Sequence, residues 1–179
     1  MQAIECIETR RSVRKFKSTP IPHDIVEKVV KVASMAPSWK NTQIARYTVC
    51  EGAIKDKIAD ECTSLYPHNG EIMKEAPALV VVSYVKNRCG YERDGSFTTS
   101  KEDRWQMFDA GIASQTFCLA AHDAGLGTVI MGIFDDIKVA SVIDLPDTEE
   151  VMCLIPMGYA DEEPIAPKRK EVTDLLRFK

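Results

Sequence analysis

Residues 104–124 form the longest segment with helical patterning, and this segment restricts the possible folds more than any other. Its interior is rich in alanine, glycine and serine, and apolar residues occur on nearly every side of it. A helix that is apolar all round has to be buried on more than one side. We therefore expect residues 104–124 to form a central helix that also lies at a subunit interface, with Gly125 ending it in a left-handed conformation.

Shorter segments with helical or extended patterning surround this central helix. Apolar spacing, proline positions and acidic capping residues predict four further helices, at residues 1–8, 22–36, 53–65 and 136–142. Runs of apolar and β-branched residues predict four strands, at residues 47–50, 78–84, 128–131 and 151–155. The pattern predicts one helix-rich domain with few strands, which spans residues 1–179.

Two segments between these elements are predicted to be loops, at residues 66–70 and 86–102. The second is long and polar, and long loops within compact domains are often lids or binding loops. An irregular surface excursion is the alternative interpretation of residues 86–102.

Charge and cysteine usage exclude several classes of protein. The formal net charge of −4 and the pI of about 5.5 argue against nucleic acid or an anionic membrane as a partner. No apolar run reaches the length of a membrane span, and the first twenty residues do not form a secretory signal. The six cysteines form no C-x-x-C pair and the three histidines are scattered, so we expect no metal site and a cytoplasmic location.

Residues 9–16 concentrate positive charge within a chain that is acidic overall. If this stretch is extended, Arg10, Ser12 and Arg14 lie on one face, because side chains alternate along a strand. Two guanidinium groups and a hydroxyl on one face are suited to an anion of phosphate size. A solvated basic turn is the alternative for this stretch taken alone.

Residues 36–43, Ala-Pro-Ser-Trp-Lys-Asn-Thr-Gln, form a polar turn between a predicted helix and a predicted strand. The hydroxyl and amide groups of this turn could face the polar edge of a heteroaromatic ligand. Ordinary turn chemistry explains the same composition, since serine and asparagine are common turn residues.

Taken together, six segments resemble the FMN-dependent nitroreductase family, and the resemblance covers nearly the whole chain. In chain order these segments are residues 10–16, residues 36–43, Asp-Ala-Gly at 109–111, Gly-Leu-Gly at 125–127 leading to Met-Gly at 131–132, Gly-Tyr at 158–159, and Lys-Arg at 168–169. The resemblance implies an α+β fold, with a mostly antiparallel central sheet wrapped by helices, in an intertwined homodimer. It also implies one FMN at each of two sites that both subunits form.

The resemblance also implies which residues contact the phosphate of FMN. Arg10 and Ser12 are expected to bind the phosphate, with Arg11 at the phosphate or the ribityl chain. Lys168 and Arg169 are expected to close the other side of the phosphate, and Lys170 could replace one of them.

Other residues are expected, on the same resemblance, to lie around the flavin ring. Arg14 is expected near the N1/O2 edge, where a cation favours the anionic reduced flavin. The backbone of Met131 and Gly132 is expected to pass N5, and Asn69 is a candidate for the polar edge of the ring. The residues expected from the partner subunit are Pro37, Ser38, Trp39 and Asn41.

The implied activity is hydride transfer from NADH or NADPH, through flavin N5, to a nitroaromatic, quinone or related small-molecule acceptor by a ping-pong mechanism. No catalytic side chain is expected, because the cofactor supplies the chemistry. The alternatives are other flavin chemistry, such as dehalogenation or flavin fragmentation, an FMN-storing protein with little turnover, and a flavin-free domain that binds a phosphorylated partner. Residues 86–102 are expected to shape the substrate pocket, with Tyr91 and Phe97 as wall residues.

Overall fold

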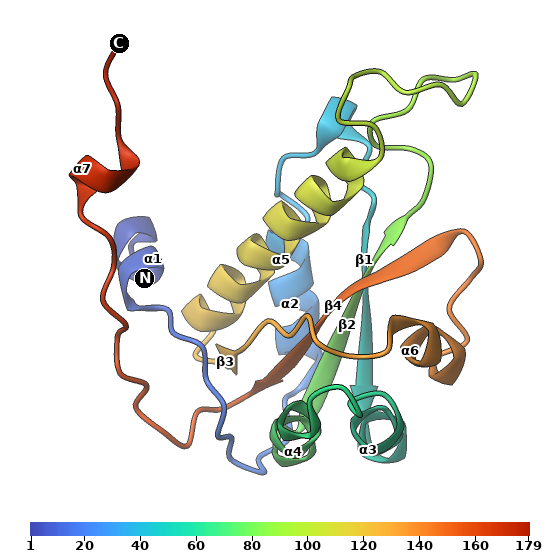
Figure 1. Cartoon of the computed structure of the whole chain (residues 1–179). Helices are drawn as coiled ribbons and strands as arrows, with labels where there is room; N and C mark the ends of the chain where they lie inside the picture. The colour runs from blue at the N-terminus through green and yellow to red at the C-terminus, as the bar shows by residue number, and fades with distance from the viewer.

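A computed structural model describes all 179 residues. Four strands form one antiparallel sheet in the spatial order β1-β2-β4-β3. Their bounds are β1 (Ala45–Glu51), β2 (Ala78–Val85), β3 (Gly127–Thr128) and β4 (Glu149–Gly158). Helices surround this sheet, which confirms the predicted α+β class (Figure 1).

The central strand β2 is buried on both faces, as its unbroken apolar sequence predicts. Leu79 and Val81 belong to the core on one face of the sheet, and Val80 and Val82 belong to the core on the other. The sheet therefore separates two layers of helices.

One layer consists of α2 (His23–Ala33) and the long α5 (Arg104–Asp123), which pack beside the Val80 face (Figure 1). The layer on the opposite face contains three shorter helices, namely α3 (Gly52–Glu61), α4 (Pro67–Glu75) and α6 (Asp136–Val142). The predicted cap of α6 is confirmed, since the Asp135 side chain accepts a hydrogen bond from the Lys138 backbone N–H at 3.0 Å.

The helix α5 occupies the predicted central position, and Gly125 follows its C-terminal end with a φ of +82°. Within one chain, however, α5 is buried on one side only. Met107 and Phe108 on the other side are 52% and 57% exposed. The expected second buried side therefore has no partner within the chain.

The N-terminal segment and the C-terminal tail run side by side (Figure 1). After α1 (Ala3–Thr9), Ser12 pairs with Thr128 of β3, and Phe16 pairs with Ala160 just beyond β4. The tail continues past this pairing to a short helix, α7 (Val172–Leu175), which the sequence pattern did not predict. None of the helices combines the length and the apolar character that crossing a membrane requires.

The prediction of a loop at residues 66–70 is wrong, because most of these residues form the first turn of α4 (Pro67–Glu75). Pro67 opens the helix, where its missing N–H costs nothing. A Cβ on Gly70 would lie 2.6 Å from the Ala59 carbonyl oxygen of α3, so glycine permits α4 to pack closely on α3. The turn signals of this segment thus reflect helix packing, and α3 ends at Glu61 instead of at the predicted residue 65.

Candidate functional site

A cavity of about 690 Å³ lies where the N-terminal segment meets the C-terminal tail. Its lining is mostly charged and comprises Arg10, Arg11, Ser12, Arg14, Glu162, Glu163, Pro164, Ile165, Pro167 and Arg169. The structure therefore brings the predicted phosphate residues of both ends of the chain into one place. Lys168 and Lys170 do not line this cavity, so of the three basic tail residues only Arg169 faces it.

The guanidinium groups of this arginine cavity have almost no partners. No arginine of the chain forms an ion pair, although Glu162 and Glu163 line the same cavity. The exception is Arg11, whose Nη1 donates to the Glu8 and Arg10 backbone carbonyls at 2.6 and 2.8 Å. Four arginines against two glutamates leave two net positive charges, which matches a phosphate monoester of roughly −1.5 to −2.

Glu162 was not predicted as a site residue, and it holds the tail against the arginine segment. Its Oε1 accepts hydrogen bonds from the backbone N–H groups of Arg14 at 2.5 Å and Lys15 at 3.2 Å. The Glu162 carboxylate therefore extends the contact between the N-terminal segment and the tail beyond the pairing of Phe16 with Ala160. The role of Glu162 depends on the pairing of Phe16 with Ala160, which are far apart in the sequence. No local sequence pattern near Glu162 could therefore have predicted it.

Two of the residues expected around the ring, Met131 and Gly132, follow β3, and Met131 pairs with Leu154 of β4. The Met131 N–H donates to the Leu154 carbonyl at 2.8 Å, and its side chain is buried, so this N–H is not available to a ligand. The N–H of Gly132, by contrast, makes no hydrogen bond, and Gly132 is exposed. Asn69 is placed beside it, since its Nδ2 donates to the Ile133 carbonyl at 3.0 Å.

The turn of residues 36–43 is rigidly built. The Ser38 Oγ accepts from the Gln43 backbone N–H at 3.0 Å, and the Ser38 carbonyl accepts from the Asn41 N–H at 3.0 Å. Lys40, Asn41 and Gln43 all have positive φ, at 45°, 55° and 49°. Non-glycine residues with positive φ cost free energy and cluster at functional sites, which favours a functional role for this turn over ordinary turn chemistry.

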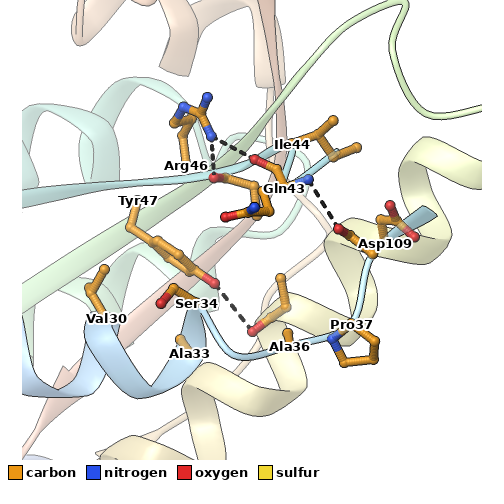
Figure 2. A pocket seen from close by; sticks show the side chains of 13 residues that line it. Val30, Ala33, Ser34, Ala36, Pro37, Gln43, Ile44, Arg46, Tyr47 and Asp109 are labelled. Carbon is orange, nitrogen blue, oxygen red and sulfur yellow. Dashed lines mark hydrogen bonds between the residues drawn. The ribbon is translucent and has the colours of Figure 1, made fainter. Parts of the chain in front are cut away.

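A second cavity of about 300 Å³ lies beside this turn (Figure 2). The turn supplies Pro37, Ser38 and Gln43, and the buried Asp109 of α5 also lines the cavity. Tyr47 closes it from β1 by donating to the Ala113 carbonyl at 3.4 Å, and burial raises the pKa of Tyr47 to about 12. Tyr47 is therefore neutral at physiological pH.

The two cavities share no residue. The turn beside the second cavity lies near the N-terminal end of α5, and α1, which leads into the arginine segment, lies along the C-terminal half of α5 (Figure 1). At one end, the Trp39 N–H of the turn donates to Asp109 Oδ2 at 2.8 Å. At the other end, Thr9 Oγ1 lies 2.9 Å from His122 Nε2, next to the arginine segment. Asp109 and His122 are thirteen positions apart, which is roughly 20 Å along a helix. One chain therefore does not bring its turn to its own arginine cavity.

Residues 86–102 project next to the turn at the N-terminal end of α5 (Figure 1). Tyr91 and Phe97 pair across a small hairpin, with ring centroids 4.9 Å apart. Lys40 of the turn contacts Glu92 of this hairpin at 3.1 Å. The loop is thus attached to the turn, while its role in a substrate pocket stays a prediction.

One thiol contacts a carboxylate at the second cavity, since the Cys89 Sγ donates to Asp109 Oδ2 at 3.1 Å. Burial, and then the Asp109 carboxylate, raise the pKa of Cys89, so this group stays a thiol near neutral pH. All six cysteines are free and buried. Burial raises the pKa of Cys50 and of Cys153 to about 11, so both remain thiols near neutral pH.

Comparisons of the sequence and of the structure with known proteins agree on one protein family. A model described as the nitroreductase family matches residues 7–159. A Methanothermobacter thermautotrophicus protein, provisionally named an NADH dehydrogenase/NAD(P)H nitroreductase, is 28% identical over 168 residues, which are 92% of this chain and 80% of the relative. An iodotyrosine deiodinase of Haliscomenobacter hydrossis is 28% identical over 185 residues, with 90% and 80% covered. The structure of an FMN-dependent nitroreductase from Clostridium difficile R20291 superposes with a TM-score of 0.74 at 28% identity, covering 92% of this chain and 91% of the other.

Proposed function

Because the chain belongs to the nitroreductase family, we propose that it is an FMN-dependent oxidoreductase. It would transfer hydride from NADH or NADPH to a nitroaromatic, quinone or related acceptor by a ping-pong mechanism. The observation that carries the proposal is the arginine cavity, in which the guanidinium groups of Arg10, Arg14 and Arg169 have no anionic partner. Unpaired cations that converge on one cavity are suited to a dianionic phosphate.

The residues present fit the phosphate of FMN. Arg10 and Arg169 would grip it from the two ends of the chain, and the Ser12 hydroxyl would add a neutral hydrogen bond. Arg11 would contribute mainly charge, because its guanidinium already donates to two backbone carbonyls. Lys168 would remain at the periphery, since it does not line the cavity.

The flavin ring would extend from this cavity along residues 128–132. Gly132 lies four positions after Thr128, which pairs with Ser12, and four positions of extended chain span roughly 13 Å. The free Gly132 N–H would donate to the ring, and Asn69 would lie at its polar edge. Arg14 would provide positive charge at the N1 edge. Bound FMN supplies the redox chemistry at N5, and the protein holds, orients and shields it.

We also propose that the functional unit is a homodimer with two equivalent cofactor sites. Pro37, Ser38, Trp39 and Asn41 would contact the flavin that the other subunit holds. The separation of the turn from the arginine cavity by the length of α5 supports this arrangement, because one chain does not bring the two together. The exposed apolar side chains of Met107 and Phe108 on α5 are suited to such a subunit contact.

The first test is the visible absorption spectrum of the purified protein, recorded before and after NADH or NADPH is added without oxygen. A flavin spectrum that bleaches supports the proposed oxidoreductase. A flavin spectrum that persists favours an FMN-storing protein. A colourless protein that also fails to take up added FMN would overturn the proposal.

Mixed dimers test whether two chains build each site. Arg10→Ala should impair the site on its own chain, and Asn41→Gly should impair the site on the partner, while glycine keeps the positive φ accessible. Either variant alone should lose flavin at both sites. A dimer with one chain of each kind should regain half of the wild-type flavin content, because one of its sites contains neither change. No recovery in the mixed dimer would contradict the two-chain site.

Reductive dehalogenation is a second candidate, favoured by the similarity to the iodotyrosine deiodinase. Turnover of a nitroaromatic and of an iodinated phenol by the same reduced preparation separates the two activities. Release of iodide with no reduction of the nitro group would favour the second candidate.

A further inference from the structure

Asp109 is a buried carboxylate that the proposed function does not use. Its side chain lies on α5 at the edge of the second cavity, and the residue is only 4% exposed (Figure 2). Its Oδ2 accepts two hydrogen bonds, from the Trp39 backbone N–H at 2.8 Å and from the Cys89 Sγ at 3.1 Å. No lysine, arginine or histidine forms an ion pair with it.

A buried carboxylate without a cationic partner is a poor way to stabilise a fold. Removing its charge from water is costly, and two hydrogen bonds compensate only in part. A well-packed apolar residue at position 109 would serve the core at least as well. An apolar residue would lack an acceptor for the Trp39 N–H and for the Cys89 thiol. A thiol is only a weak donor, so the contact with the Trp39 N–H is the one that most needs an acceptor.

The contact matters because the turn is strained. Residues 40, 41 and 43 have positive φ, and such conformations persist only where surrounding contacts fix them. Hydrogen bonds within the turn hold its own shape, but they do not fix its position on the molecule. Asp109 forms the only hydrogen bond from residues 36–43 to α5, and a charged acceptor gives roughly twice the strength of a neutral one.

We propose that Asp109 is a positioning residue that, through the Trp39 N–H, fixes residues 37–41 in the arrangement that completes the cofactor site of the other subunit. This inference rests on the proposed function in one respect only, namely that the turn contacts a flavin. The fixing of the turn is a property of the chain alone and can be measured without any cofactor.

The first experiment measures amide hydrogen exchange of the flavin-free protein. In Asp109→Ala, exchange at the Trp39 N–H should rise by about tenfold or more, because its acceptor is gone. In Asp109→Asn, the amide oxygen still accepts this hydrogen bond, and the increase should be about threefold or less. Cys89→Ala is the matched control, since it removes the other donor to Asp109 and leaves the contact with Trp39. Exchange at Trp39 that is unchanged in Asp109→Ala would overturn the proposal.

The second experiment titrates FMN into the same variants by flavin fluorescence. Asp109→Ala should weaken FMN binding about tenfold, whereas Cys89→Ala should stay within about threefold of the wild type. Equal weakening in both variants would mean that Asp109 acts through general packing and would overturn the proposal. If Asp109→Ala does not fold, Asp109→Asn takes its place in the titration. FMN binding should then be weaker in Asp109→Asn than in the wild type, whereas Cys89→Ala should stay near the wild type.

Mixed dimers distinguish a positioning effect on the partner from loss of local structure. Asp109→Ala combined with Arg10→Ala should restore half of the wild-type flavin content, because the two changes then fall on the same site. A local effect of Asp109→Ala on its own arginine cavity would leave both sites defective. If the wild-type protein binds no FMN at all, the proposed function fails, while the exchange experiment still decides whether Asp109 fixes the turn.

Discussion

Gly127 offers a direct test of how the fold supports the arginine cavity. A Cβ at this position would lie 2.7 Å from Cγ2 and 2.8 Å from Cβ of Val13. These distances are too short for van der Waals contact, and the Val13 Cβ moves only with its backbone. Val13 is held in place by its N–H, which donates to the Thr128 carbonyl at 3.0 Å. Gly127→Ala must therefore displace the segment that carries Ser12 and Arg14 into the cavity.

The expected cost follows from these contacts. Overpacking a well-packed site costs about 1–3 kcal/mol. Replacing glycine removes unfolded-state freedom and returns roughly 0.4–1 kcal/mol. We therefore expect Gly127→Ala to destabilise the flavin-free protein by about 1–2 kcal/mol. Val13→Ala removes two buried methyl groups and should cost roughly 2 kcal/mol by itself.

The double variant supplies the decisive comparison. The new methyl group of Gly127→Ala fits the space that Val13→Ala vacates, so the combined loss should fall short of the sum by about 1 kcal/mol or more. Urea denaturation measures these values, and FMN titration should show weaker binding in Gly127→Ala than in the double variant. Gly132→Ala is the control for stability, because a Cβ there has no atom within 4 Å. Additivity within about 0.5 kcal/mol would refute the proposed contact between Gly127 and Val13.

Three further predictions concern charge and burial. Arg169→Ala should weaken FMN binding by about 1.5–3 kcal/mol in a fluorescence titration, and Lys168→Ala by much less, because only Arg169 lines the cavity; equal losses would contradict the assigned register of the tail. Burial first, and then the Arg10 guanidinium, hold the pKa of His122 below its ordinary value of 6.5. The unfolded chain therefore protonates His122 more readily than the folded chain does, so the free energy of unfolding should fall as the pH drops below 6.5. Urea titrations at several pH values should show a smaller loss in His122→Asn. Ellman's reagent should label none of the six buried cysteines in the folded protein and all of them in denaturant; rapid labelling of the folded protein would show that a thiol is exposed.

Local sequence signals predicted those elements whose stability is local. The apolar run of β2 and the long pattern of α5 can be recognised within one window of sequence, and both lie within a residue of the predicted bounds. The helix α4 has weaker local signals, since Gly70 in its first turn normally disfavours a helix. Its reason for being there is the close contact with Ala59 of α3, which no local pattern contains.

The site was predictable as a set of segments and not as a set of contacts. Arg10, Ser12 and Arg14 line one cavity, but so does Arg11, which strand alternation would have placed on the opposite face. Whether Lys168, Arg169 or Lys170 joins them depends on the path of the tail after Glu162, which a hydrogen bond to Arg14 determines. These two residues are 148 positions apart, so their contact has no signature in the sequence.

The long helix α5 connects the two parts of the proposed site. Near its N-terminal end Asp109 holds the turn, and at its C-terminal end the carbonyl of Leu119 accepts from the Cys6 Sγ of α1 at 3.4 Å. An α-helix is stiff, so the roughly 15 Å between Asp109 and Leu119 along its axis is fixed. Two copies of this helix, packed through their exposed sides, would then set the distance between the arginine cavity of one chain and the turn of the other. The side chains on the exposed side of α5, Met107 and Phe108 among them, would determine how closely the two chains approach and hence whether each cofactor site closes.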